Sequence, residues 1–281
     1  MFTLLSNYRR PTPIPKLPVS AKPWCLVMCA VLMSACGSRH VDGSGTALEE
    51  VRPLTPEVTH VSVHGEGLLV VTQGSDTSLR IRADDNIVPL LRSEIVAGVL
   101  TLGPEDGVSP DSENALVYGL TLPRIESVET SGATRAQIGP VEGPHFELRT
   151  SGASQARAES ITAERVAFVS TGASSIDSAL EAAAANVSLS GSSRIELRGR
   201  TNEQEVEASG ASEYRGRTLR SHRAEVRASG SSACELFADE SIRVDGTGAS
   251  NVRYQGGGQV SRSLSGAASV DVLPEQGSDP L

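Results

Sequence analysis

The sequence of 281 residues contains few aromatic side chains and few cysteines. Phenylalanine, tyrosine and tryptophan together make up 3% of the chain, whereas sugar-binding clefts generally rely on aromatic platforms. Three of the four cysteines lie within the first 36 residues, and only Cys234 lies beyond them. One cysteine cannot form a disulfide framework or a zinc site, so we expect Cys234 to be buried as a small apolar side chain.

Long apolar segments and helical stripes are scarce as well. The most apolar run, Trp24–Met33, is too short to span a bilayer. The rest of the chain is dense in Ser, Thr, Val and Gly and lacks apolar stripes of period 3.6, which disfavours helical repeats. Residues 179–185 alone have a helical composition, and we expect them to form a corner of a β-structure.

The first 35 residues have the features of an export signal. A basic stretch precedes the apolar run, and a Met-Ser-Ala-Cys sequence that ends at Cys36 follows it. Small residues before a cysteine at this place resemble a bacterial lipobox, which is cleaved before the cysteine and lipidated on it. We therefore predict a signal peptide at residues 1–35 and a lipid anchor on Cys36 that attaches the protein to a membrane. The alternative is an ordinary signal peptide ending in alanine, with a periplasmic or secreted product.

Cleavage would leave an acidic chain without lysine. The removed segment carries four basic residues and no acidic ones, which changes the net charge from −9 to about −13. Such a charge argues against nucleic acid as a partner and against electrostatic binding to anionic lipid heads. No aspartate follows Cys36 directly, which in enteric-type sorting favours the outer membrane. Residues 36–57 are predicted to be a flexible tether.

A short motif, Ser/Thr-Gly-(Ala/Ser)-(Ser/Thr/Ala), recurs along the second half of the chain at a spacing of about 19 residues. Its glycines are Gly132, Gly152, Gly172, Gly191, Gly210, Gly230, Gly248 and Gly266. A fixed period of this length is typical of stacked units that are too small to bury a core alone.

Around each motif, apolar and polar positions alternate with a period of two, which indicates strands. One apolar column consists of Val128, Leu148, Phe168, Val187, Val206, Val226 and Val244, with Arg262 as its only exception. A second begins at Ala136 and contains Ile195, Tyr214 and Cys234. We predict an all-β fold: a single-stranded parallel β-helix (β-solenoid) of about eight repeats at residues 123–273, with three short strands in each coil.

The polar positions contain two columns in which the sign of charge largely alternates. One column reads Gln137, Arg157, Asp177, Glu196, Arg215, Glu235, Arg253 and Asp271. The other reads Glu129, Arg149, Val169, Ser188, Glu207, Arg227, Asp245 and Ser263. If equivalent positions stack at the ~4.8 Å strand spacing, opposite charges become neighbours. Each exposed pair contributes only ~0.2–1 kcal/mol, so the columns specify register more than they add stability.

The fourth position of the motif is a hydroxyl residue in all repeats but the last. This structural Ser/Thr ladder consists of Thr134, Ser154, Ser174, Ser193, Ser212, Ser232 and Ser250. By parity we expect the hydroxyls to point inward and to hydrogen-bond along the column. A row of nucleophiles is disfavoured because no His or Asp recurs beside it.

The segments that flank the repeats are less regular. Residues 58–122 alternate in several short runs and are predicted to be a β-rich N-terminal cap, since terminal units of repeat arrays are atypical. Residues 274–281 are polar and predicted to be disordered.

The ordered combination of these segments resembles the GIN-domain family, also called the auto-transporter adhesin head domain. The resemblance rests on residues 80–86, 97–102 and 120–125 and on the Ser-Gly-Ala-Thr sequence of residues 131–134 with its seven successors. It covers residues 58–272 and implies a β-helix in an exported or lipid-anchored bacterial protein. The biochemical function of the family is not established, so the resemblance implies no catalytic residue.

The residue types that carry catalysis or bind metals are scattered in this sequence. His60 and His64 lie on a predicted strand, where ~13 Å separates them at 3.3 Å per residue, and His40, His145 and His222 stand alone. Carboxylates are spaced about one per coil and interleaved with Arg, and the closest doublets are Asp84–Asp85 and Glu105–Asp106. We expect no metal, no cofactor and no catalytic site.

The sequence thus predicts a non-catalytic, lipid-anchored protein of the bacterial cell envelope with a structural or adhesin-like β-surface. An exported module that binds a glycan or a protein partner is the first alternative. A polysaccharide-active enzyme is the second, because many parallel β-helices cleave polysaccharides.

Overall fold

The computed structural model describes residues 39–274. Within this range the chain forms strands and one 3₁₀ turn, and none of its helical segments is long and apolar enough to cross a membrane. Residues 1–38 and 275–281 lie outside the description, and with them the predicted signal peptide, the lipid anchor on Cys36 and nearly all of the predicted disordered tail.

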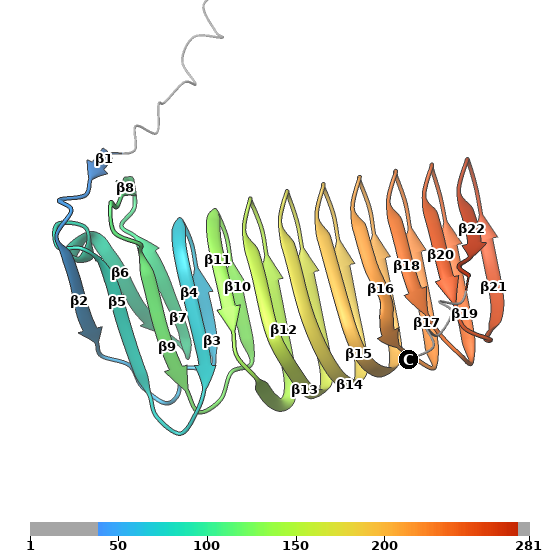
Figure 1. Ribbon diagram of the computed structural model, residues 1–281, viewed down its shortest axis with the longest axis horizontal. Coiled ribbons are helices and arrows are strands. Elements are labelled where there is room, and N and C mark those ends of the chain that lie inside the picture. The colour runs from blue at the N-terminus through green and yellow to red at the C-terminus, as the bar shows by residue number, and fades with distance from the viewer. Residues whose placement is uncertain (1–38, 275–281) are drawn as a thin grey trace, which may run out of the picture. The chain divides into compact units, whose positions relative to one another are not determined.

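A β-solenoid of about seven turns occupies most of the described chain (Figure 1). Its strands are β10 (Ser127–Thr130), β11 (Ala133–Ile138), β12 (Val141–Thr150), β13 (Gln155–Ser170), β14 (Ser175–Leu189), β15 (Arg194–Ala208), β16 (Glu213–Arg220), β17 (Arg223–Ala228), β18 (Ala233–Phe237), β19 (Ser241–Gly246), β20 (Asn251–Gln255), β21 (Gln259–Leu264) and β22 (Ser269–Val272). Every ladder between its coils is parallel, with Val128 opposite Leu148 and Leu148 opposite Phe168. The predicted fold class and the predicted stacking are confirmed.

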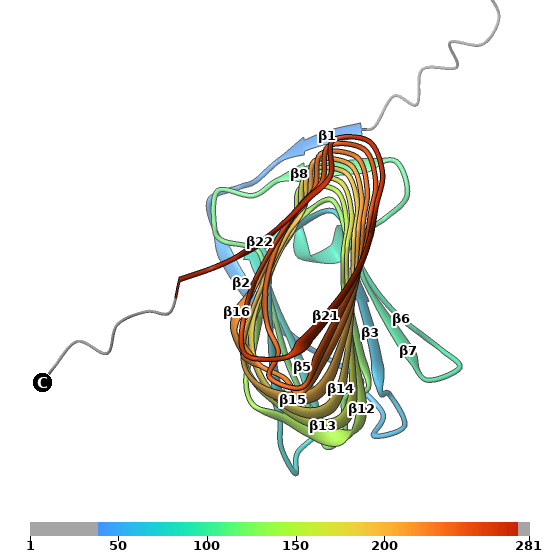
Figure 2. The same ribbon diagram turned by 90° about the vertical axis from the view of Figure 1, so that its right-hand side faces the viewer.

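Each coil is flattened, with two long faces rather than three short strands (Figure 2). We call face A the side formed by β10, β12, β17, β19, β21 and the second halves of β13–β15, and face B the side formed by β11, β16, β18, β20, β22 and the first halves of β13–β15. The motif forms the tight turn from face A to face B, and a wide curve leads back. Strand β13 extends over 16 residues through that curve without a break. Residues 179–185, expected to form a corner, are part of the continuous strand β14.

The motif glycines determine how closely the coils stack at the tight turn. Gly191 has φ +77°, a left-handed conformation, and a Cβ there would lie 2.7 Å from the carbonyl oxygen of Gly172. That conformation and that closeness both exclude a side chain. The amide of Ala211 in the next coil donates to the Gly191 oxygen at 2.8 Å, so the turn continues the hydrogen-bonded ladder.

The inward columns form one continuous apolar core through the solenoid. Ile195, Leu197, Val206 and Tyr214 are completely buried. The column pattern ends at the last coil, where Val260, Leu264 and Val272 are 38%, 39% and 66% exposed.

The opposite end of the solenoid is covered by the N-terminal strands. These are β1 (Arg39–Asp42), β2 (Ala47–Arg52), β3 (His60–Val63), β4 (Glu66–Gln73), β5 (Ser78–Asp84), β6 (Leu91–Val96), β7 (Val99–Pro104), β8 (Val108–Asp111) and β9 (Val117–Leu122), with the 3₁₀ turn η1 (Val88–Leu90) between β5 and β6. Strands β3 and β4 pair parallel with β10 and β11 of the solenoid and, on their other edges, with β7 and β9. Strand β5 pairs antiparallel with both β2 and β9. Ile87 and Val88 are completely buried at this end.

The prediction of a flexible tether at residues 36–57 is wrong for Arg39–Asp42 and Ala47–Arg52, which form strands. Strand β1 pairs parallel with β8, and β2 pairs antiparallel with β5 over Ala47–Arg52. The segment is ordered because long-range pairing satisfies its backbone groups, although its composition is that of a polar loop.

Candidate functional surface

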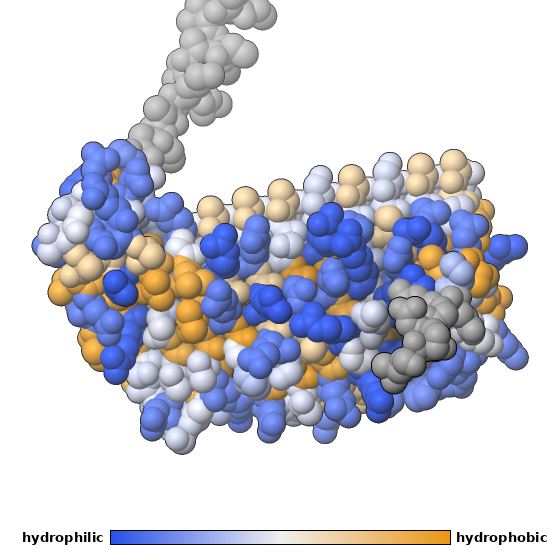
Figure 3. All heavy atoms as spheres, viewed as in Figure 1, coloured by the Kyte–Doolittle hydropathy of each residue, from blue (hydrophilic) through white to orange (hydrophobic). Residues whose placement is uncertain are grey.

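The charged columns lie in register on the two outer faces, as the sequence predicted. On face B, Arg215 lies between Glu196 and Glu235 in the ladder, and its guanidinium is 3.7 Å from Glu196. On face A, Arg227 contacts Glu207 of the preceding coil at 3.1 Å. The visible face in Figure 3 is accordingly covered by polar side chains, with apolar residues between them. These exposed pairs stabilise little but neutralise the paired charges locally.

Contacts within a strand and between neighbouring strands neutralise the carboxylate of Glu213. The guanidinium of Arg215 approaches Glu213 at 2.7 Å, and Arg194 approaches the other oxygen of Glu213 at 2.8 Å. Partial burial alone would raise the pKa of Glu213. The hydrogen bonds from Arg215 and Arg194 outweigh this effect and hold the pKa below its ordinary value. Such a carboxylate stays ionised and bound, and is unsuited to act as a general acid.

The seven hydroxyls of the predicted ladder are all buried, but they do not form a hydroxyl chain. Ser154 donates to the carbonyl of Ser151 at 2.7 Å, and Ser174 donates to that of Thr171 at 2.8 Å. Ser193 instead donates at 2.9 Å to Ser170 of the preceding coil. Five of the seven hydroxyls therefore bind main-chain carbonyls, whereas the buried hydroxyls of Ser212 and Ser250 have no hydrogen-bond partner among the described residues. The sequence could not indicate this pattern because a turn carbonyl has no side-chain signature. The hydroxyls that bind carbonyls help to close the tight turn.

Cys234 is buried, as expected, directly beside Tyr214 in the ladder. Burial raises the pKa of the Cys234 thiol to about 12, so it is protonated at neutral pH and unreactive.

The two acidic doublets are engaged in structure. Asp84 is completely buried and accepts hydrogen bonds from the Ser112 hydroxyl at 2.7 Å and from the side chain of Asn114. Asp85 accepts a hydrogen bond from Ser44, which ties the start of the chain to the cap. Asp106 is exposed and pairs with Arg92 at 3.2 Å. Neither doublet forms the separated carboxylate pair that glycosidases use.

The histidines that appeared isolated in the sequence have partners in the structure. His145 Nε2 is 2.9 Å from Arg165, and His222 Nδ1 is 2.9 Å from Asp239. His60 starts strand β3, as predicted, and its nearest acidic partner is Glu126 at 3.9 Å.

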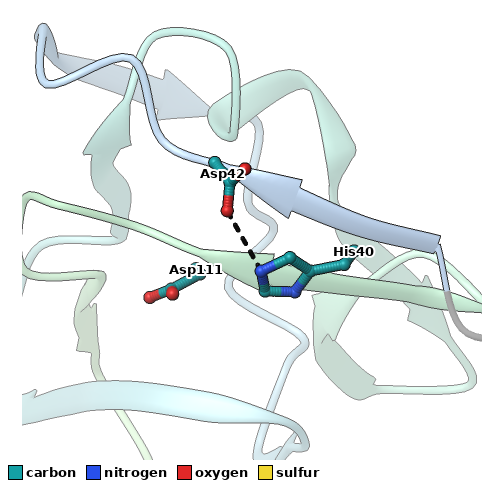
Figure 4. Close-up of side chains that lie close together, drawn as sticks. All are labelled: His40, Asp42 and Asp111. Carbon is teal, nitrogen blue, oxygen red and sulfur yellow. Dashed lines mark ion pairs between the residues drawn. The ribbon is translucent and has the colours of Figure 1, made fainter.

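His40 joins Asp42 and Asp111 in a cluster that the sequence did not reveal. Its Nε2 lies 3.0 Å from Asp42, and ligand atoms of all three residues lie within 4.8 Å of one another (Figure 4). The pairing of β1 with β8 brings Asp42 opposite Asp111, and no local sequence pattern reports that pairing. The donor types suit a transition metal, but all three side chains are exposed, and exposed acidic groups are commonly just solvated.

Shallow hollows lie on the outer faces of the described solenoid. One of about 560 Å³ lies on face B between residues 70–72, 137–139 and Arg157. Another, of about 470 Å³, crosses face A from Ala184 to Ser261. Both are lined by residues that belong to the regular columns.

The sequence of residues 57–258 matches the family model described as "Putative auto-transporter adhesin, head GIN domain". The chain belongs to this family. The match covers the cap and nearly all of the solenoid, as the resemblance in the sequence implied, and the description of the family names no catalytic activity.

Solved structures share the fold of this GIN-domain protein. A putative adhesin from Parabacteroides distasonis is 18% identical with a TM-score of 0.77, and one from Parabacteroides merdae is 17% identical with a TM-score of 0.75. Each alignment covers 84% of this chain, together with 100% and 99% of the respective relative. A structure from P. distasonis titled a putative lipid binding protein is 16% identical over 84% of this chain and 100% of that one, with a TM-score of 0.71. None of the curated proteins matches the chain.

Proposed function

We propose that this GIN-domain protein is a non-catalytic, lipid-anchored protein of the bacterial cell envelope, whose solenoid presents an adhesin-like surface. The observation that supports it most is the pairing of the outward carboxylates with arginines of the same or the next coil, as at Glu213 and Glu207. Many acidic and basic groups of this surface are held in ion pairs, and the surface offers a long, rigid array of hydrogen-bonding groups.

The anchor in this proposal is a diacylated Cys36, and the destination is the outer membrane. Its support is the lipobox-like sequence before Cys36. The first described strand, β1, starts at Arg39, so few residues separate the proposed anchor from the folded cap. The solenoid would therefore be held close to the membrane rather than on the long tether that the sequence suggested.

The anchor is tested by following the full-length protein in a Gram-negative host. We expect labelling by an alkyne fatty acid, globomycin-sensitive processing, and fractionation with the outer membrane. The variant Cys36→Ala should lose the label and leave the membrane fraction, whereas Cys29→Ala, in the apolar run, should behave as the parent. A Cys36→Ala protein that stays equally membrane-bound would contradict the anchor.

The alternative of an exported module without a lipid is supported by the alanine before Cys36, which also suits an ordinary signal peptidase. Mass spectrometry of the mature N-terminus distinguishes the two. A free, unmodified N-terminus at Cys36 or beyond would favour this alternative, and a lipid-modified Cys36 would exclude it.

The enzyme alternative is tested by incubating the protein with polysaccharides and assaying new chain ends. We expect no turnover, because three of the four carboxylates of the acidic doublets are bound within the structure: Asp84 by Ser112 and Asn114, Asp85 by Ser44, and Asp106 by Arg92. Turnover above that of a heat-denatured sample would overturn the non-catalytic assignment.

A further inference from the structure

The ladders between residues 39 and 274 bring like-charged side chains next to each other in only a few places. Three of these pairs are acidic and one is basic. The acidic pairs are Asp42/Asp111, Asp177/Glu196 and Glu205/Glu225, and the basic pair is Arg200/Arg220. Like charges at directly opposite positions destabilise a sheet unless something neutralises them.

Each acidic pair has an arginine or histidine partner within the chain. Arg227 reaches both members of the Glu205/Glu225 pair at 2.5 Å. Arg198 binds Asp177 at 2.7 Å, and Arg215 lies 3.7 Å from Glu196. At the third pair, His40 lies 3.0 Å from Asp42.

The Arg200/Arg220 pair has no such partner among the residues that the structure describes. Neither guanidinium lies within 4.0 Å of a carboxylate or hydrogen-bonds to another group there. Glu181 is the ladder neighbour of Arg200 but makes no ion pair with it. Arg220 lies over the ring of Phe237, with 4.1 Å between its Cζ and the ring centroid, and this cation–π contact holds the guanidinium in place. Two adjacent guanidinium groups, one of them held over a ring, are therefore available to an anionic ligand.

These arginines line a pocket of about 450 Å³ at the wide curve of the solenoid. Its other lining residues are Ala182 and Phe237, which are apolar, and the polar Glu181, Thr201, Asn202, Ser221 and the His222–Asp239 pair. Carboxylates, an amide and an imidazole accept and donate hydrogen bonds to hydroxyl groups.

We propose that this pocket binds an acidic saccharide, with the carboxylate of a uronic-acid unit bridging Arg200 and Arg220 and its ring hydroxyls facing Asn202, His222 and Asp239. Paired guanidinium groups suit a carboxylate because each donates two parallel hydrogen bonds. The pocket carboxylates, which would repel a purely anionic ligand, become acceptors for sugar hydroxyls. Recognition by charge and hydrogen bonds is compatible with a chain that has few aromatic residues to stack on sugar rings.

The inference deepens the adhesin-like part of the proposed function and is independent of the lipid anchor. It is tested with the full chain in mild detergent, by titrating an oligogalacturonide and its carboxyl-reduced, neutral counterpart in a calorimeter. We expect the acidic oligosaccharide to bind and the neutral one to bind at least tenfold more weakly. Loss of the charge-assisted hydrogen bonds in Arg200→Gln/Arg220→Gln should weaken binding roughly tenfold to a hundredfold.

Arg135→Gln is the matched control, because Arg135 is also an exposed arginine without an ion pair within residues 39–274 but lies outside the pocket. Its affinity should equal that of the parent. The double variant should melt at the same temperature as the parent or higher, since the change removes a repulsion, and this separates a binding defect from misfolding.

Absence of binding, or equal binding by the double variant, would overturn the pocket assignment. Equal affinity for acetate, sulfate or an oligoglutamate would overturn its saccharide character. If the protein does not bind the oligosaccharide but carries a lipid on Cys36, the anchor proposal still holds. If the protein binds the oligosaccharide but carries no lipid, the pocket proposal still holds.

Discussion

Single residues in this solenoid are assigned to the core or to solvent by their position relative to the motif. Ile195 is completely buried and stacks between Ile176 and Tyr214, while its chain neighbour Glu196 faces outward. This alternation holds across the coils because each strand face is either inside the stack or outside it.

Replacing Ile195 with Asp should destabilise the fold by about 3–5 kcal/mol, because it leaves an unpaired charge in the core. The measurement is urea unfolding followed by circular dichroism. Glu196→Gln, one residue away, should change the free energy of unfolding by less than about 1 kcal/mol. Equal midpoints for Ile195→Asp and the parent would refute the inward assignment.

The inward and outward assignment could be predicted from the sequence because it needs only the period of two. The partners of polar groups could not. The hydroxyl of Ser154 binds a carbonyl of its own turn rather than the next hydroxyl, and His222 pairs with Asp239 of the following coil. These contacts depend on the side-chain rotamers and on the shape of the coil, and neither can be inferred from the spacing of residue types along the sequence.

At the scale of the element, the tight turn combines two requirements in one glycine. Gly191 needs a left-handed backbone and also touches Gly172 of the preceding coil. Gly107 shares only the first requirement, since it has φ +76° with nothing near a Cβ position. Gly257 has neither.

Changing each of these three glycines to Ala distinguishes the cost of backbone strain from the cost of a steric clash between coils. We expect Gly257→Ala to be nearly neutral, and Gly107→Ala to cost about 1–2 kcal/mol for the left-handed backbone. Gly191→Ala should cost more than Gly107→Ala by at least about 1 kcal/mol, because the added methyl also forces the coils apart. Thermal unfolding of the three variants provides the comparison, and equal losses at Gly191 and Gly107 would show that the close stacking is unimportant.

The N-terminal strands depend on a buried carboxylate. Asp84 is the last residue of β5, and a Cβ on Gly43, between β1 and β2, would lie 2.2 Å from Asp84 Oδ2. The hydrogen bond from Ser112, followed by those from Asn114, lowers the pKa of Asp84 against the opposing effect of burial. The ionised form is therefore favoured in the folded state.

This contribution should be complete above the ordinary aspartate pKa of about 4 and should be lost as the pH falls through the lower pKa of the folded state. We expect Asp84→Asn to be less stable than the parent at pH 6, and the gap between the two to narrow steadily towards pH 2. Urea unfolding at a series of pH values measures the gap. Asp106→Asn, at an exposed carboxylate, is the control, and a gap for Asp84→Asn that is constant with pH would contradict the role of ionised Asp84.

The two N-terminal strands, β1 and β2, could not be predicted from the sequence because their pairing is long-range. Residues 39–52 are polar at most positions, and their strands form only because β8 and β5 offer partners far along the chain. Each repeat, in contrast, pairs with the next copy of itself, so the period of the sequence determines the register of the strands. Periodic structure can be predicted from one sequence, whereas a single long-range pairing cannot.

At the scale of the molecule, the two ends of the solenoid differ. The N-terminal end is covered by β2, β5 and the segment around Val88, whereas the last strands, β21 and β22, are paired on one side only within the described residues. Val260, Leu264 and Val272 are exposed there. An open apolar edge of this kind invites pairing with another copy.

Arg262 lies in the middle of this open end. It continues the inward column after Val226 and Val244, and it is the only charged residue in that column. A charge that points towards the core position of an edge strand is a known device against edge-to-edge association, because a second copy would have to bury it. We therefore expect the parent protein to remain monomeric at this end.

We expect Arg262→Val to promote self-association at this edge, because the substitution completes a valine column and removes the charge. Burial of one valine contributes about 1.5–3 kcal/mol, so the apparent association constant should rise at least tenfold. Sedimentation velocity over a range of protein concentrations measures this change. Arg262→Lys retains the charge and should behave as the parent, and an Arg262→Val protein as monomeric as Arg262→Lys would show that the edge is protected by something other than this residue.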